Sequence, residues 1–127
     1  MPSPERVHAF VAAVREGRFV EAIEDFYDVD ASMRENLAPP RVGRDVLVEG
    51  EKAALARVNG IATHGVGPVL IDGDHVVINW VFQITNRDGS VRRLDELALQ
   101  TWRGDRIVAE QFYYDPSQYT TPVHLAS

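Results

Sequence analysis

The sequence predicts an α+β fold in which three N-terminal helices pack on a strongly curved, mostly antiparallel sheet. Hydrophobic residues recur at helical spacing as far as residue 58, whereas apolar and polar residues alternate after Gly60. Three turn signals then divide the rest of the chain into four long segments. Because helices and strands do not alternate, a doubly wound sheet is excluded. The helices must therefore cover one sheet face, and a small-molecule pocket is expected beneath them.

The first helix is predicted from Ser3 and Pro4, an N-cap followed by a first-turn proline, up to Gly17. Its inward face would carry Val7, Phe10, Val11 and Val14. A second helix is expected from about Arg18 to Asp28, so that the two helices form a hairpin. The residues at helical spacing that indicate it are Phe19, Ile23, Phe26 and Tyr27.

The segment from Ala31 to Asn36 is too short for a helix and precedes two prolines, which favours a short strand and a loop. A third helix is predicted from Asp45, as its N-cap, to Val58, and Asn59-Gly60 would stop it. Its inward residues would be Leu47, Ala54, Leu55 and Val58.

The second half of the chain is expected to form an antiparallel meander. The four predicted strands are Thr63–Ile71, Asp74–Thr85, Val91–Arg103 and Arg106–Tyr114. The turns between them are indicated by Asp72-Gly73, by the stretch from Asn86 to Gly89, and by Gly104-Asp105. The tail beyond Pro116 is expected to be a loosely docked extension.

Length and composition limit the classes of function. A chain of 127 residues has room for a single domain, residues 1–127. The net charge of −6 argues against nucleic acid or a membrane as partner. The sequence has no cysteine, its four histidines lack metal-ligand spacing, and no run resembles a signal peptide or a membrane span. These features predict a soluble cytoplasmic protein without a metal or a cofactor.

Hydrophobicity alone does not decide which face of the last two strands points inward. On the strand before the final hairpin, Glu96 and Gln100 lie on one face, whereas Asp95 and Leu97 lie on the other. A change of one residue in the pairing at Gly104-Asp105 would exchange the two faces.

Three short stretches resemble the nuclear-transport-factor-2-like superfamily, and more narrowly its SnoaL-like polyketide cyclase and ketosteroid isomerase branch. They are Ala31-Ser32-Met33-Arg34-Glu35, Val42-Gly43-Arg44-Asp45, and Trp102 to Ile107 running on to Tyr113-Tyr114-Asp115. The resemblance implies a cone-shaped, cystatin-like fold around a pocket and a homodimer formed through the outer sheet face. It also places Glu96 and Gln100 inward, and it leaves Leu97 and Leu99 for the dimer interface.

The resemblance supplies a set of candidate site residues. The catalytic candidates are Glu35, Glu96, Glu110 and Tyr114, since carboxyl groups in an apolar pocket have raised pKa values and can exchange protons near neutral pH. The ligand-binding candidates are Tyr27, Trp80, Phe82, Gln100, Trp102 and Phe112. Ketosteroid isomerase has its proton-shuttling carboxylate at the position of Glu35, so this residue would act as the general base.

Two departures from that family argue against the isomerase reaction itself. The isomerase has a tyrosine at the position of Phe10 and a protonated aspartic acid at that of Ala98, and both donors stabilise the enolate oxygen. The related limonene epoxide hydrolases need an arginine and two aspartates where Trp80, Phe82 and Phe112 stand, so epoxide hydrolysis is not expected.

Two functions from different classes remain. The first is a cofactor-independent isomerase, cyclase or dehydratase that acts by carboxylate proton transfer on a small hydrophobic carbonyl compound. The second is a non-catalytic ligand-binding or protein-interaction module of the same fold.

Overall fold

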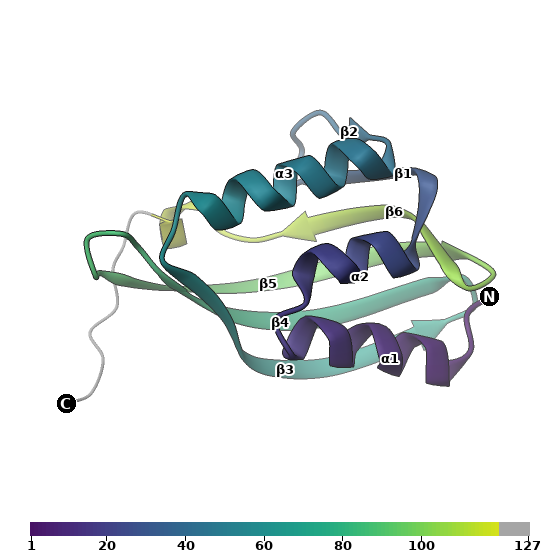
Figure 1. Ribbon diagram of the computed structural model, residues 1–127. Coiled ribbons are helices and arrows are strands. Elements are labelled where there is room, and N and C mark those ends of the chain that lie inside the picture. The colour runs from purple at the N-terminus through teal and green to yellow at the C-terminus, as the bar shows by residue number, and fades with distance from the viewer. Residues whose placement is uncertain (120–127) are drawn as a thin grey trace.

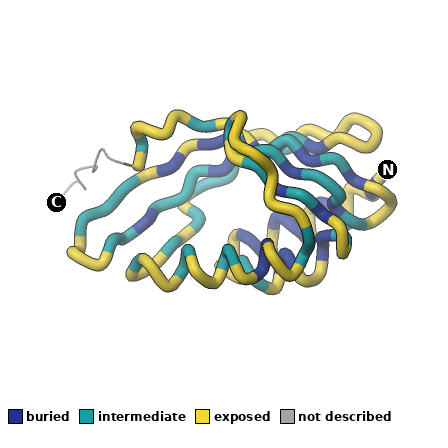
Figure 2. Tube along the Cα trace, turned by 90° about the horizontal axis from the view of Figure 1, so that it is seen from above, coloured by how far each residue is buried: buried dark blue, intermediate teal, exposed yellow. Residues whose placement is uncertain are grey.

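A computed structural model of the chain describes residues 1–119. Three helices lie on the concave face of one curved, six-stranded sheet, as the sequence predicts (Figure 1; Figure 2). The helices are α1 (Pro4–Arg15), α2 (Phe19–Phe26) and α3 (Arg44–Ala56). The strands are β1 (Tyr27–Glu35), β2 (Arg41–Val42), β3 (Gly60–Asp72), β4 (His75–Thr85), β5 (Val91–Arg103) and β6 (Arg106–Tyr113).

The sheet is mixed, with the strand order β2-β1-β6-β5-β4-β3. The pairing from β3 to β6 is antiparallel and follows the chain, which confirms the predicted meander. β1 runs parallel to β6, and the short β2 pairs antiparallel with β1 at the edge. β1 and β2 therefore extend the predicted four-stranded meander.

α1 forms where its local signals place it. The Oγ atom of Ser3 accepts a hydrogen bond from the backbone N–H of Arg6 at 3.1 Å, and Pro4 occupies the first turn. Gly17, with a φ of 80°, lets the chain turn back towards α2. The buried face of α1 consists of Val7, Phe10, Val11, Ala13 and Val14.

The second helix is shorter than predicted, and the strand after it is longer. α2 ends at Phe26, and Tyr27 already has an extended backbone, with a φ of −97° and a ψ of 142°. From Tyr27 onwards the chain pairs with β6, a strand some eighty residues later in the sequence. Tyr27 is buried as part of the strand. A buried residue at this spacing is compatible with a helix as well as with a strand, so the sequence pattern does not distinguish the two.

The third helix also begins differently. Gly43, with a φ of 105°, occupies the N-cap position, and Asp45 lies in the first turn, where its charge favours the positive end of the helix dipole. The helix ends at Ala56, before Val58. Leu47 is buried as expected.

The register of the last hairpin turns Glu96 and Gln100 inward, while Asp95 and Leu97 are exposed. Trp102 pairs with Ile107, but Thr101 pairs with Ala109, so a bulge lies between these two pairs. Because of this bulge, Ile107 and Glu110 both face the interior and are 0% and 3% exposed.

The start of the tail is docked more firmly than predicted. Pro116–Tyr119 form the 3₁₀ helix η1. Within it, the side chain of Gln118 bonds to the backbone N–H and the carbonyl of Asp95 at 2.8 and 3.1 Å. The remainder of the predicted extension, residues 120–127, lies outside the described residues.

Candidate functional site

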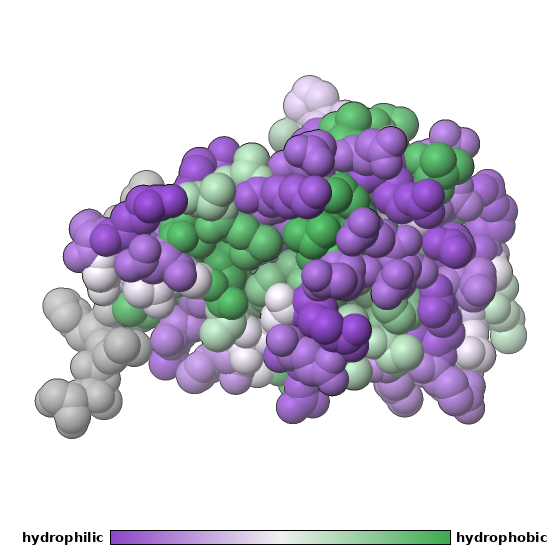
Figure 3. Space-filling model, in the orientation of Figure 1, coloured by the Kyte–Doolittle hydropathy of each residue, from purple (hydrophilic) through white to green (hydrophobic). Residues whose placement is uncertain are grey.

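A cavity of about 570 Å³ lies between the concave sheet face and the helices. Figure 3 shows hydrophobic side chains gathered in a hollow below α3, with hydrophilic side chains around it. The volume is in the range of pockets that hold small organic ligands. The residues that line the cavity include Phe10, Phe19, Tyr27, Glu35, Arg41, Glu51, Arg57, Trp80, Phe82, Asn86, Arg92, Glu96, Glu110, Phe112 and Tyr119.

Aromatic rings form much of the cavity wall. Trp80 and Phe82, on the same face of β4, are stacked with centroids 5.6 Å apart and an interplanar angle of 19°. Phe19 of α2 packs edge-on against Phe82, and Phe10 of α1 packs edge-on against Trp80. The helices thus hold the rings of β4 in place, and the wall presents a rigid apolar surface to a ligand.

A hydrogen-bonded network surrounds Glu110, which is almost fully buried. The hydroxyl of Tyr27 donates to Oε1 of Glu110, and Nε2 of Gln100 donates to Oε2 at 2.7 Å. The indole Nε1 of Trp102 donates to Oε1 of Gln100 at 3.0 Å, which fixes the orientation of the amide. Burial raises the pKa of Glu110 to about 7, although both of its hydrogen bonds lower it.

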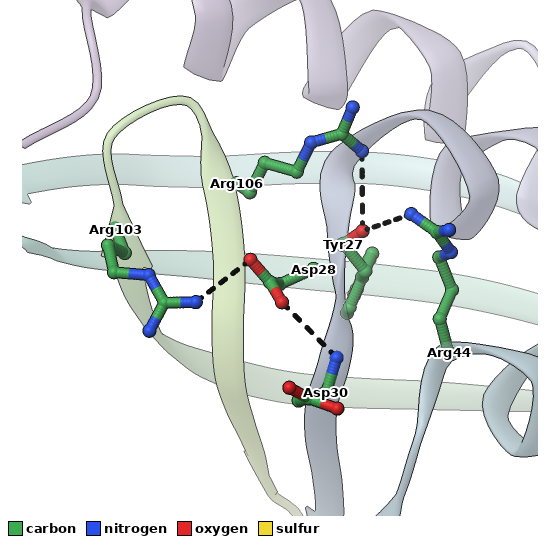
Figure 4. A network of polar contacts seen from close by, with 6 residues as sticks. All are labelled: Tyr27, Asp28, Asp30, Arg44, Arg103 and Arg106. Atoms are coloured by element: carbon green, nitrogen blue, oxygen red, sulfur yellow. Dashed lines mark hydrogen bonds and ion pairs between the residues drawn. The ribbon is translucent and has the colours of Figure 1, made fainter.

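Arginine side chains anchor Tyr27 at the start of β1 (Figure 4). The carbonyl oxygen of Tyr27 accepts from Arg44 Nη1 at 3.2 Å and from Arg106 Nη1 at 3.4 Å. Beside it, Arg103 forms an ion pair of 3.0 Å with Asp28, whose other carboxylate oxygen accepts from the backbone N–H of Asp30. These contacts hold the backbone of Tyr27 where α2 becomes β1, so that its hydroxyl reaches Glu110.

Glu96 is the second buried carboxyl group of the cavity wall. It is 7% exposed and lies across from Trp80 in the β4–β5 register. Its carboxyl group has no hydrogen-bond partner within residues 1–119. Burial, together with the negative charges of the nearby carboxylates of Glu110, Glu35, Glu51 and Asp95, raises the pKa of Glu96 to about 8. At neutral pH this group is therefore mostly protonated and can donate a hydrogen bond into the cavity.

Two further carboxyl groups belong to the helix-side rim. Glu35 is the last residue of β1; it is exposed but still lines the cavity. Glu51 comes from α3, one helical turn after Leu47. Burial raises the pKa of Glu51, the positive charge of Arg41 lowers it, and the negative charge of Glu35 raises it.

Arg92 and Tyr119 form another part of the rim. Arg92 Nη1 donates to the carbonyl oxygen of Tyr119 at 2.7 Å, and its Nη2 donates to Asn86 Oδ1 at 2.9 Å. The guanidinium also lies 5.0 Å from the centroid of the Tyr119 ring. Tyr114 packs edge-on against Tyr119, and burial together with the charge of Glu35 raises the pKa of Tyr114.

Most of the predicted site residues meet at this cavity. Those on its lining are Tyr27, Glu35, Trp80, Phe82, Glu96, Glu110 and Phe112. Gln100 and Trp102 lie behind Glu110 as its supports, and Tyr114 lies behind Tyr119. The residues at positions 10 and 98 are both buried and apolar, so no oxyanion donor stands where the ketosteroid isomerase has two.

Three lining residues, Glu51, Arg92 and Tyr119, are not among those predicted from the sequence. Helical spacing from Leu47 could have indicated Glu51, because both lie on the inward face of α3. Arg92 has the same strand parity as Glu96, which could have indicated it as well. No local signal marks Tyr119, since its position depends on how η1 docks on β5.

Residues 1–119 show neither a metal-binding cluster nor a membrane-spanning helix. That part of the chain contains no group of three or more His, Asp or Glu side chains placed to hold a metal ion. None of its helices is long and apolar enough to cross a membrane.

Comparison with solved structures places the fold among known proteins. TerC, co-crystallised with polyporic acid, is 19% identical with a TM-score of 0.78, over 91% of this chain and 93% of that one. A protein with a ketosteroid isomerase-like fold from Catenulispora acidiphila, in complex with trimethylamine, is 23% identical with a TM-score of 0.76, over 91% and 89% of the two chains. A candidate SnoaL-like polyketide cyclase from Mesorhizobium loti is 22% identical with a TM-score of 0.74, over 87% and 97%.

These identities are low, so the likeness concerns the fold and leaves the activity open. No curated protein matches the chain. The family model of the SnoaL-like domain matches residues 7–110, which include all or the larger part of every strand and helix that contributes to the cavity except η1. The chain therefore belongs to the SnoaL-like domain family.

Proposed function

We propose that the protein binds a small hydrophobic carbonyl compound in this cavity and transfers a proton to it without a cofactor. The observation that carries the proposal is Glu96, a buried carboxyl group without a hydrogen-bond partner among residues 1–119, beside the stacked rings of Trp80 and Phe82. An unpartnered carboxyl group in an apolar wall is costly unless a ligand or water completes its hydrogen bonding.

The two buried carboxyl groups suit different roles. Glu96, with a pKa of about 8, carries a proton at neutral pH and can give it to a ligand oxygen as a general acid. Both oxygens of Glu110 already accept hydrogen bonds from Tyr27 and Gln100. This group therefore shapes the part of the cavity wall around it and holds negative charge there. Glu35, at the solvent-accessible rim, is the proposed general base.

In the proposed step, Glu96 protonates the carbonyl oxygen while Glu35 removes a proton from the adjacent carbon. Return of a proton to a different carbon gives isomerisation. Loss of a neighbouring hydroxyl group as water, with the proton supplied by Glu35, gives dehydration, and attack of the enol carbon on a second carbonyl carbon of the same molecule gives cyclisation. We therefore propose an isomerase, cyclase or dehydratase activity.

The ligands in the crystal structures of two neighbours support a small-molecule role, but they do not indicate one particular ligand. TerC was crystallised with polyporic acid and the Catenulispora protein with trimethylamine. The same fold thus accommodates an acid and an amine, so the choice of ligand depends on the residues that line each cavity.

The test is a screen of enones and cyclic ketones against the wild type, Glu96→Gln and Glu35→Gln. Turnover should fall by about a hundredfold or more in both variants, since general acid–base groups contribute that much. Asp95→Asn is the matched control, because it removes a charge from the same strand on the exposed face. Turnover that is unchanged in Glu35→Gln would remove this residue from the mechanism.

The second candidate is a non-catalytic binding module, which the apolar residues Phe10 and Ala98 favour. In that case, ketones would raise the melting temperature of the wild type without being converted, and Trp80→Ala would abolish the shift.

We also propose that residues 1–127 form one domain that pairs as a homodimer through the outer sheet face. Leu97 and Tyr113 support this proposal, since they are neighbours across β5 and β6 and are 47% and 43% exposed. Adjacent exposed apolar side chains on a sheet are typical of an interface.

A further inference from the structure

The charges around Glu96 indicate which ligands the cavity selects. The titratable and charged groups that surround it are Glu110 on β6, Glu35 on β1, Glu51 on α3, Asp95 and Arg92 on β5, Arg41 on β2, Arg57 after α3, and the tyrosines Tyr27, Tyr114 and Tyr119. The charged groups that shift the pKa of Glu96 are all acidic. A ligand atom beside Glu96 therefore experiences a negative potential.

Three arginines line the cavity, and the Nε atom of Arg92 is buried without a hydrogen-bond partner within residues 1–119. Arg92 is held by the carbonyl oxygen of Tyr119 and the side chain of Asn86. The charge of Arg41 acts on Glu51, and Arg57 is exposed at the rim. None of the three forms an ion pair within residues 1–119 with one of the cavity glutamates. The cavity glutamates are thus not paired with an arginine, and a positive centre on a ligand can pair with them when they are ionised.

The aromatic wall also favours a ligand with a positive centre. Trp80 faces Glu96 across the β4–β5 register and stacks on Phe82. Indole and phenyl faces attract cations through their quadrupoles, and the attraction is strongest where water is excluded. Carboxyl groups and aromatic rings in one pocket favour a positive centre over a negative one.

We infer that the cavity stabilises positive charge on the ligand beside Glu96, so that it accepts uncharged carbonyl compounds and basic amines and excludes carboxylic acids. This inference rests on the proposed small-molecule function and specifies its substrate class. As Glu96 transfers its proton, its carboxylate would lie beside the carbonyl group and stabilise the positive charge that develops there while Glu35 removes the carbon-bound proton, so that the step yields a neutral enol. The absence of oxyanion donors at Phe10 and Ala98 agrees with this polarity.

An amine with the same apolar frame is a stable mimic of the protonated ligand. At neutral pH a dissolved amine is already an ammonium ion, so its binding converts protonated Glu96 into a carboxylate and releases one proton to the solvent. A ketone or an alcohol binds without this release. The number of protons released therefore reports whether Glu96 contacts the charged centre, independently of affinity.

The probes are naphthylmethylamine, naphthylmethanol and naphthoate, which share one apolar frame and differ in charge. We expect the full-length protein to bind the amine about tenfold or more tightly than the alcohol, and naphthoate more weakly than both. Calorimetry at neutral pH in phosphate and in Tris should show release of close to one proton with the amine and none with the alcohol. The release should shrink as the pH rises from neutral through about 8, because a growing fraction of Glu96 is already ionised before the ammonium ion binds.

Variants separate the contribution of Glu96 from that of the wall. Glu96→Gln should weaken amine binding about tenfold, remove the proton release and leave alcohol binding within about twofold. Asp95→Asn, on the outer face, should retain both the preference and most of the release. Because glutamine is close in size to glutamic acid and is uncharged like the protonated carboxyl group, Glu96→Gln should stay folded, which its circular dichroism spectrum checks.

The outcomes distinguish the two proposals. If the alcohol binds as tightly as the amine, or naphthoate binds most tightly, the inference on charge is overturned while small-molecule binding stands. Amine binding that survives Glu96→Gln with its proton release intact would also overturn it. If none of the three probes binds to folded protein, both the inference and the proposed function are contradicted.

Discussion

At the residue scale, Glu96 makes the stability of the protein depend on pH. Its pKa is about 8 in the folded state against a reference value of 4.5, so the folded protein binds the proton more tightly than the unfolded chain does. The stabilisation is complete below about pH 4.5 and is lost as the pH rises through about 8. Glu110, with a pKa of about 7, acts in the same direction.

We therefore expect the free energy of unfolding of the wild type to fall by a few kcal/mol between about pH 5 and pH 9. Glu96→Gln should remove most of the fall at the alkaline end, because glutamine does not ionise. Urea denaturation at a series of pH values measures this slope. Equal slopes in the two proteins would show that Glu96 is solvated in the folded state.

The Tyr27–Glu110 contact is the second prediction at this scale. Tyr27→Phe removes a buried donor and should destabilise the protein by about 1–3 kcal/mol. It should also raise the pKa of Glu110, since the hydrogen bond from Tyr27 lowers it. A double-mutant cycle with Glu110→Gln measures the coupling between the two side chains.

The control is Tyr113→Phe, which removes a hydroxyl group from an exposed position of the outer sheet face. It should change stability by less than about 0.5 kcal/mol. A coupling energy of zero in the cycle would mean that the contact contributes nothing to folding.

At the element scale, β3 contains a position where only glycine fits. A Cβ atom built on Gly67 would lie 2.5 Å from Oδ1 of Asn79 on β4 and 3.0 Å from its Cβ and Cγ. Gly65, two residues earlier on the same strand, has open space at this point. The two positions form a matched pair: Asn79 of β4 lies close to Gly67, whereas nothing within the described residues lies close to Gly65.

Gly67→Ala should lower the free energy of unfolding by about 1–3 kcal/mol, because the side chain of Asn79 or the strand must shift. Gly65→Ala should be neutral or slightly stabilising, since alanine reduces the entropy of the unfolded chain. Urea denaturation of both variants tests the difference. Adding Asn79→Ala to Gly67→Ala should recover part of the loss, and no recovery would argue against this contact.

At the scale of the whole molecule, the outer sheet face tests the proposed homodimer. Leu97→Glu places a charge next to Tyr113 in the centre of β5 and should shift the protein from dimer to monomer at micromolar concentration. The control is Leu70→Glu, because Leu70 is 60% exposed on the edge strand β3. Sedimentation velocity measures the mass, and a wild type that sediments as a monomer would contradict the proposal.

Local signals were enough to predict α1 and the hairpins of the meander. Ser3, Pro4 and Gly17 act through hydrogen bonds and backbone angles within a few residues of their own positions, and Gly73 and Gly104 do the same in their turns. The family resemblance added the inward orientation of Glu96. These features depend on the neighbouring sequence or on the pattern of the family, so the structure agrees with what was predicted for them.

The remaining features depend on contacts between distant parts of the chain. Tyr27 is part of a strand because β6 supplies its partners, and Ile107 joins Glu110 in the interior because a bulge interrupts the last hairpin. The raised pKa of Glu96 depends on Glu110, Glu35 and Glu51, which come from three other elements. The local periodicity of the sequence does not predict such interactions, because residues become buried and charges come close together only when the sheet curves around the helices.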